Sequence, residues 1–145
     1  MSGMRITGIL GILLVVVVCT VFWLKGGLAT DQDLINTFRG NEAEFNALAQ
    51  LIASRPQLVG SAEVRQRIAK LGEMEVLPSW NPDDQHIYFL MSATGYAVHS
   101  KYKGLLRSDV AVTPLLATLD DAQIPLHTVA FRKISDGWYL YLQRD

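Results

Sequence analysis

An uninterrupted apolar segment near the N-terminus constrains this chain more than any other feature of its sequence. Residues 6–24 carry no charge over 19 positions and consist mainly of Ile, Leu and Val. A helix of this length, rising about 1.5 Å per residue, extends about 28 Å, which matches the hydrocarbon core of a bilayer. The segment therefore predicts a single-pass transmembrane helix that anchors the chain in a lipid bilayer.

Processing of this segment is the main alternative. Gly27 and Ala29 are small residues at the positions that a signal peptidase inspects, so cleavage after Ala29 is conceivable. The apolar core of a signal peptide usually has about 7 to 15 residues, however, and Lys25 precedes the cleavage position, so we expect an uncleaved anchor. Lipidation of Cys19 is not expected, because Val18 rather than a small residue precedes it. As the only cysteine, Cys19 also excludes an intramolecular disulfide and a thiolate zinc site.

The remainder of the chain is long enough for one domain. We divide the sequence into a short head (1–5), the anchor (6–24), a juncture (25–30) and a single α+β domain (31–145). Arg5 and the terminal amine favour an inside position for the head, although Lys25 lies on the far side. The anchor is therefore expected in the inner or cytoplasmic membrane, with the domain on its periplasmic or extracytoplasmic side.

The charge of the domain argues against nucleic acid as a partner. From residue 31 onward there are 14 acidic residues and 11 of the 13 basic ones, a net charge of −3. A mildly acidic surface gives no electrostatic basis for binding a phosphate backbone.

Helical periodicity predicts a long first helix in the domain. Apolar residues at helical spacing favour one helix over residues 31–54, with Asp31 as its cap and a proline just beyond its end. Gly40 and Asn41 are poor helix formers, and Asn41 followed by Glu44 resembles a new capping arrangement. Two shorter helices are therefore the alternative.

A second, shorter helix is predicted over residues 62–71. Ser61 is its expected cap and Gly72 its expected end. Its inward residues are Val64, Ile68 and Leu71, and its polar face is basic through Arg65, Arg67 and Lys70. We expect this basic face to be solvated, with a contact to lipid headgroups or an acidic partner as the alternative.

The rest of the domain has the pattern of strands. Residues 86–93 and 96–102 predict one antiparallel hairpin around a Thr-Gly turn, and residues 127–134 and 138–143 predict a second around Ser-Asp-Gly. Between them, residues 113–119 predict a short helix that buries Leu115, Leu116 and Leu119. The order of elements favours an α+β fold, with helices packed on one face of a four-stranded antiparallel sheet built from the two hairpins.

No pattern in the sequence indicates catalysis, a cofactor or a metal site. Neither GxSxG nor SxxK occurs, and no glycine-rich loop joins a strand to a helix. His86, His99 and His127 fall in predicted strands without a recognised ligand spacing, so we expect no metal there. Acidic pairs at Asp83-Asp84 and Asp120-Asp121 are expected to be solvated rather than to bind calcium or to act in catalysis.

The aromatic strand near the C-terminus suggests a binding surface. Because side chains alternate along a strand, Trp138, Leu140 and Leu142 share one face and Tyr139 and Tyr141 the other. Beside Tyr88 or Tyr96, an exposed tyrosine face would form an amphipathic patch for a partner. The alternative, tyrosines lying under a helix, is the commoner arrangement.

Several residues carry a diffuse resemblance to a group of bacterial proteins. Phe38, Asn41, Phe45 and Leu48, the Gly95-Tyr96 turn and the closing run from Asp136 to Tyr141 are similar to small envelope-anchored proteins of unknown function. The resemblance spans most of the domain and implies an envelope location. It implies no catalytic residues.

These observations favour a membrane-anchored, non-enzymatic binding or accessory domain with a protein partner. Immunity to a toxin, assembly of an envelope complex and sensing are all compatible with it. One alternative is a structural subunit of a larger membrane complex, in which residues 6–24 pack against other helices. Another is a small hydrolase that uses dispersed residues such as His99 and Asp109, for which no small-molecule substrate is indicated.

Overall fold

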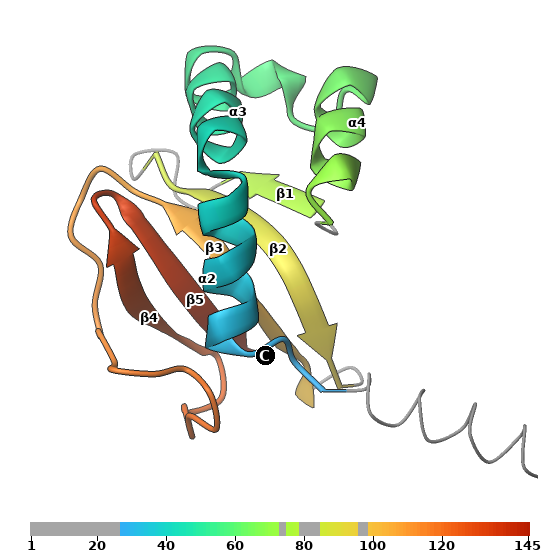
Figure 1. Ribbon diagram of the computed structural model, residues 1–145. Helices are drawn as coiled ribbons and strands as arrows, with labels where there is room; N and C mark the ends of the chain where they lie inside the picture. Colours follow the sequence, from blue (N-terminus) through green and yellow to red (C-terminus); the bar gives the residue numbers. More distant parts are fainter. Residues whose placement is uncertain (1–26, 73–74, 79–84, 96–98) are drawn as a thin grey trace, which may run out of the picture.

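The computed structural model describes residues 27–72, 75–78, 85–95 and 99–145. These residues form an α+β fold with three α-helices and a five-stranded antiparallel sheet (Figure 1), which confirms the predicted fold class. The predicted anchor at residues 6–24 lies outside this part of the chain. Within it, no helix has the length and apolar character needed to cross a bilayer.

The first helical region consists of two helices rather than the single one that we preferred. Helix α2 spans Asp31–Gly40 and helix α3 spans Glu42–Ser54. Asn41 leaves the helical conformation between them, with φ −135° and ψ 20°. Its side chain donates to the carbonyl of Thr37 rather than capping α3. The break thus follows the poor helix formers, but without the capping bond that we considered for Asn41.

The cap of α2 is Thr30 and not Asp31. The Thr30 hydroxyl accepts the Asp33 N–H, and the Asp33 carboxylate accepts the Thr30 N–H, which completes a capping box. Asp31 is instead the first helical residue, and only 1% of its surface is exposed. This displacement by one residue gives Asp31 a role that the sequence did not indicate.

The second predicted helix is confirmed as α4, which spans Ala62–Lys70 and follows a 3₁₀ turn, η1, at Pro56–Leu58. The Ser61 hydroxyl accepts the Val64 N–H as the predicted cap. Gly72, just beyond the helix, has a φ of +75°, which glycine adopts without strain. The predicted inward residues Val64, Ile68 and Leu71 are all buried.

The sheet has one strand more than predicted. Its strands are β1 (Glu75–Pro78), β2 (Ile87–Thr94), β3 (Lys101–Arg107), β4 (Thr128–Ser135) and β5 (Trp138–Arg144), in the spatial order β1-β2-β3-β5-β4. The β4–β5 hairpin matches the prediction closely. β3 begins five residues later than predicted and continues through an apolar run that was not predicted to be a strand. β1 was not predicted, because a strand of four residues shows too little periodicity to be recognised.

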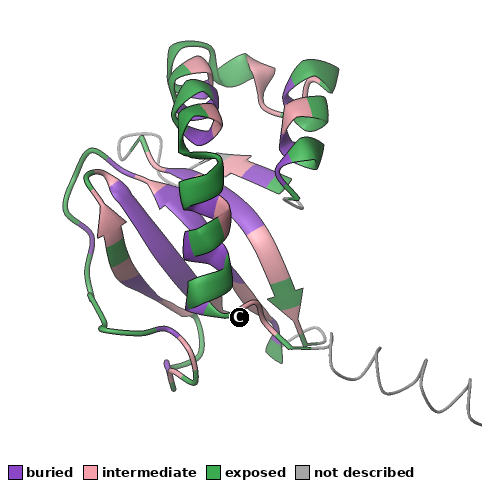
Figure 2. Ribbon diagram, in the orientation of Figure 1, coloured by how far each residue is buried: buried purple, intermediate pink, exposed green. Residues whose placement is uncertain are grey.

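Helices cover one face of this sheet. Helix α2 crosses the strands of the sheet, and α3 and α4 lie beyond the upper end of α2 in this view (Figure 1). The buried residues of the sheet lie beneath the helices (Figure 2). Trp138, Leu140 and Leu142 point to this side, where they join one cluster with residues such as Phe38 and Phe45. The core therefore lies on the Trp138 side of β5, a choice that the alternation alone had left open, and the tyrosines do not lie under the described helices as in the commoner arrangement.

The predicted helix at residues 113–119 is absent. This segment is extended and follows the outer edge of β4, where the Phe131 N–H donates to the Pro114 carbonyl and the Leu116 N–H donates to the Phe131 carbonyl. Backbone groups used in this way are not available for helical bonds. Of the three leucines expected to be buried, only Leu119 is, whereas Leu115 and Leu116 are exposed.

Candidate binding site

The face of the sheet opposite the described helices gathers four tyrosines. The strand register places Tyr88 opposite Leu106 and Leu106 opposite Tyr139, and it pairs Gly104 with Tyr141. Residues opposite each other in antiparallel strands point to the same side, so these side chains share the face opposite Trp138. We call this surface the tyrosine face and define it by Tyr88, Tyr102, Tyr139 and Tyr141.

Three of the four tyrosines predicted to bind a partner lie on this face, and none of the described helices covers it. Tyr139 and Tyr141 are 8% and 1% exposed and form its floor, whereas Tyr88 is half-buried. The rings of Tyr88 and Tyr141 meet edge to face, with centroids 5.1 Å apart. Tyr96 lies outside the described residues. Tyr102 was missed because its position in β3 was mistaken for the end of a strand.

Gly104 has no side chain, which lets β2 and β3 approach each other closely beneath this face. A Cβ atom at Gly104 would overlap the carbonyl of Phe89. The overlap arises where the register shifts between Leu90 and Ser92, which leaves Met91 as the extra residue of a β-bulge. Gly104 therefore permits a close approach of backbones at the centre of the sheet.

Two adjoining depressions hollow the tyrosine face. The larger, of about 380 Å³, includes His127 and Val129 in its lining, and the other, of about 230 Å³, includes Glu75 and Tyr102. Both are mainly apolar. They share the residues Tyr88, Gln143 and Asp145. The two depressions thus combine an aromatic floor with a few polar groups at the rim.

Carboxylates supply the formal charges among the residues that line these depressions. Glu75 is exposed on β1, and Asp145 follows β5, where its carboxylate accepts a hydrogen bond from the Gln143 amide at 2.9 Å. Neither carboxylate forms an ion pair with a lysine or arginine of the described residues. The site therefore has a negative potential that is not neutralised internally.

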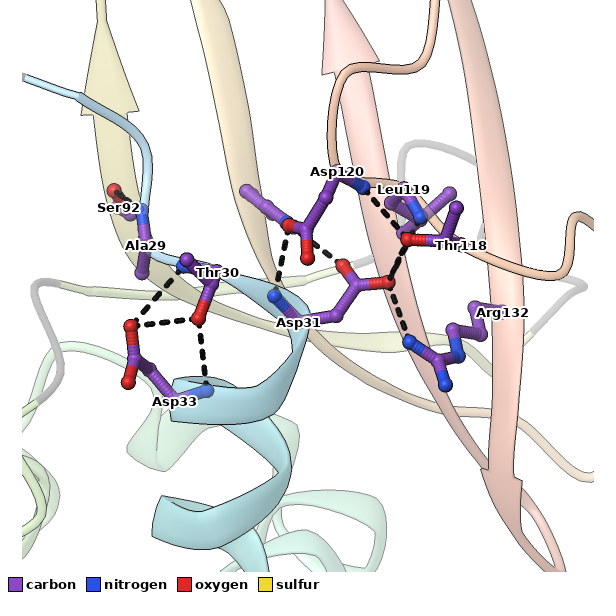
Figure 3. A network of polar contacts seen from close by, with 10 residues as sticks. Ala29, Thr30, Asp31, Asp33, Ser92, Thr118, Leu119, Asp120 and Arg132 are labelled. Carbon is purple, nitrogen blue, oxygen red and sulfur yellow. Dashed lines mark hydrogen bonds and ion pairs between the residues drawn. The ribbon is translucent and has the colours of Figure 1, made fainter.

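On the opposite face, a buried ion-pair network holds the start of α2. The two oxygens of the Asp31 carboxylate contact Lys103 Nζ of β3 and Arg132 Nη1 of β4, each at 2.7 Å (Figure 3 shows the Arg132 contact). Lys103 also contacts Asp120 Oδ1 at 2.7 Å, and only 2% of its side chain is exposed. The same Asp120 oxygen accepts the Asp31 N–H. Asp31 and Lys103 at the centre of the network are buried, whereas the side chains of Arg132 and Asp120 are 32% and 39% exposed.

Further hydrogen-bond donors lower the pKa of Asp31. The Leu119 N–H and the Thr118 hydroxyl both donate to Asp31 Oδ2, at 2.8 and 3.0 Å. Burial alone raises the pKa of Asp31, but the hydrogen bonds from Lys103, Leu119 and Arg132 outweigh it and lower that pKa to about 2. The carboxylate therefore stays ionised inside the domain.

The described histidines and Asp109, the remaining candidate residues, lie in the connections between strands. His86 and His127 precede their strands, and His99 lies in the β2–β3 connection, so none is within a strand as predicted. Within the described ranges, no group of three or more His, Cys, Asp or Glu side chains is placed to hold a metal ion. His99 and Asp109 lie beyond opposite ends of β3, roughly 20 Å apart for a strand of this length.

The acidic pairs and the basic helix face also have local roles. Asp120 pairs with Lys103, which the expectation of a merely solvated pair did not include, although 39% of its side chain is exposed. Asp121 is exposed, as expected. The pair Asp83-Asp84 lies outside the described residues. On α4, Arg67 is bonded to Glu44 of α3 at 2.6 Å. Arg65 and Lys70 of the same helix are exposed, as predicted for a solvated face.

The chain shows no significant match to protein-family models, to curated proteins or to solved structures.

Proposed function

We propose that this protein is a membrane-anchored, non-enzymatic binding module that recognises a protein partner through its tyrosine face. The observation that carries the proposal is this aromatic face, which no described helix covers and which two depressions hollow. Tyrosine offers a large apolar area with a polar tip, and it is enriched at protein interfaces for that reason. The composition of the face thus supports recognition of another macromolecule.

The start of the domain supports display close to a bilayer. The Ala29 N–H donates to Ser92 Oγ of β2 at 3.0 Å, so the chain is fixed to the sheet at that point (Figure 3). Between Leu24, the end of the proposed anchor, and Ala29, the chain extends at most about 17 Å. An uncleaved anchor would hold the Ser92 end of β2 near the lipid surface and leave the tyrosine face beside it.

Membrane attachment is tested on the full chain expressed in bacterial cells. We expect the protein to remain in the membrane pellet after extraction with alkaline carbonate, and a periplasmically active reporter fused after Asp145 to be active. Release of the intact protein by carbonate, a mature N-terminus at Thr30, or a reporter active only in the cytoplasm would contradict the proposed location.

The binding surface is tested by photo-crosslinking in intact membranes. A benzophenone amino acid in place of Tyr102, which is half-buried on the tyrosine face, is expected to give a discrete adduct with one partner protein. Gln66, exposed on α4, provides the matched control position. Absence of an adduct from Tyr102, or the same adducts from both positions, would reject the tyrosine face as the binding surface.

A further inference from the structure

We infer that the smaller depression on the tyrosine face receives an arginine or lysine side chain from an extended segment of the partner. The inference rests on the proposed function and specifies the chemistry of its partner. It follows from three properties of the depression, namely its rings, its charge and its continuity with the larger one.

Aromatic rings form the walls of the depression. Tyr88, Tyr102 and Tyr141 come from β2, β3 and β5 and line a space of about 230 Å³ together with Leu77 and Leu90. The face of an aromatic ring carries negative charge density, which attracts a cation within about 6 Å of the ring centre. Three aromatic residues lining one small space can thus accommodate a cationic group, and the charge of the rim decides between it and a neutral apolar one.

The charge of the rim has the same sign. Glu75 and Asp145 line this depression, and no lysine or arginine is among the described residues that line it. The Gln143 side-chain amide donates a hydrogen bond to Asp145 Oδ1. This bond holds the Asp145 carboxylate beside the depression. Two carboxylates without a described cationic partner favour a positively charged group on the ligand, whereas an anionic ligand would be repelled.

Continuity with the larger depression favours a peptide over a small cation. The two depressions share Tyr88, Gln143 and Asp145, and the larger adds Val129 and Thr128 to the lining. In an extended peptide, alternate side chains point to the same side about 7 Å apart. A basic residue in the smaller depression would place the residue two positions away over the larger, which suits an apolar or β-branched side chain.

The test uses the full-length protein in detergent and fluorescein-labelled heptapeptides of sequence Gly-Ser-Val-Arg-Val-Ser-Gly. Matched peptides carry citrulline, lysine or glutamate at the central position. Citrulline has the shape of arginine without its charge. We expect the arginine or lysine peptide to bind at least about 10-fold more tightly than the citrulline and glutamate peptides, as measured by fluorescence polarisation.

Variants assign the effect to the depression. Glu75→Gln and Asp145→Asn are each expected to weaken binding of the basic peptide by about 3- to 10-fold, and Tyr102→Leu by about 5- to 20-fold. Glu63→Gln removes an exposed carboxylate from α4 and should leave binding unchanged. Preservation of the far-ultraviolet circular dichroism spectrum checks that each variant is folded.

Several outcomes would overturn the inference. These are equal binding of the arginine and citrulline peptides, no binding of any peptide, or insensitivity to Glu75→Gln and Asp145→Asn. Preferential binding of phosphocholine over the basic peptides would assign the depression to a lipid headgroup instead. If Tyr102 still cross-links a partner in membranes, such results would reject only the cationic side chain and leave the proposed function standing.

Discussion

Replacing Asp31 by alanine is expected to lower the free energy of unfolding by about 3 to 5 kcal/mol, because the change leaves Lys103 buried without its main counter-ion. Lys103 has almost no exposed surface, and Asp120 is then its remaining described anionic contact. The Leu119 N–H also loses its acceptor. Urea unfolding of the full chain in a mild detergent, followed by circular dichroism, measures the loss.

A surface ion pair provides the matched control. Glu44→Ala breaks the pair with Arg67, whose side chains are 39% and 28% exposed, and it should cost at most about 1 kcal/mol. Lys103→Met added to Asp31→Ala removes the stranded cation and should restore part of the stability. If Asp31→Ala lowers the free energy of unfolding by no more than Glu44→Ala does, the buried network does not stabilise the domain.

The pH dependence of the same variant supplies a second readout. Because the pKa of Asp31 falls from 3.8 to about 2 on folding, its ionised form stabilises the domain above about pH 4 by about 2 kcal/mol. This contribution is lost as the pH falls through about 2. The difference in stability between the wild type and Asp31→Ala should therefore shrink by about 2 kcal/mol between pH 7 and pH 2.

Trp138→Ala is expected to have an effect of similar size, about 3 to 5 kcal/mol, through the core rather than through charge. Trp138 is 2% exposed, and its ring lies 5.0 Å from that of Phe38, 6.0 Å from Phe45 and 5.7 Å from Phe89. It thus joins both parts of the broken first helix to the sheet. Urea unfolding followed by circular dichroism measures the loss without depending on the removed fluorophore.

Two further variants separate the components of the Trp138 effect. Asn46→Ala removes the acceptor of the indole N–H, a bond of 2.9 Å, and should cost about 1 kcal/mol. Trp138→Phe keeps an aromatic ring, so it should lower the free energy of unfolding by less than half as much as Trp138→Ala does. A loss below about 2 kcal/mol for Trp138→Ala would show that the cluster does not join helices and sheet as described.

Elements whose ends are set by local chemistry could be predicted from the sequence. The Ser61 cap and Gly72 mark the ends of α4, and the turn at Gly137, with a φ of +70°, fixes the β4–β5 hairpin. The alternation around Trp138 also sorted the residues of β5 into two faces, although it did not say which of them is core. In each case the determining residues lie within a few positions of one another.

Features that depend on distant parts of the chain were not predictable in this way. Residues 113–119 have a helical pattern, but the free edge of β4 supplies hydrogen bonds that the pattern does not reveal. A lysine in a strand is expected to be exposed, but Lys103 is buried because it pairs with Asp31, which lies 72 positions earlier in the chain. The carboxylates of the candidate site, Glu75 and Asp145, line one depression only because β1 and β5 belong to one sheet.

The buried network has a mechanical consequence for a protein tethered at its N-terminus. Asp31 joins the first turn of α2 to β3 through Lys103 and to β4 through Arg132. Under the proposed anchoring, a pull on the N-terminal segment would load ion pairs to two strands at once. The force would then be shared between β3 and β4 rather than borne by the first turn of α2 alone.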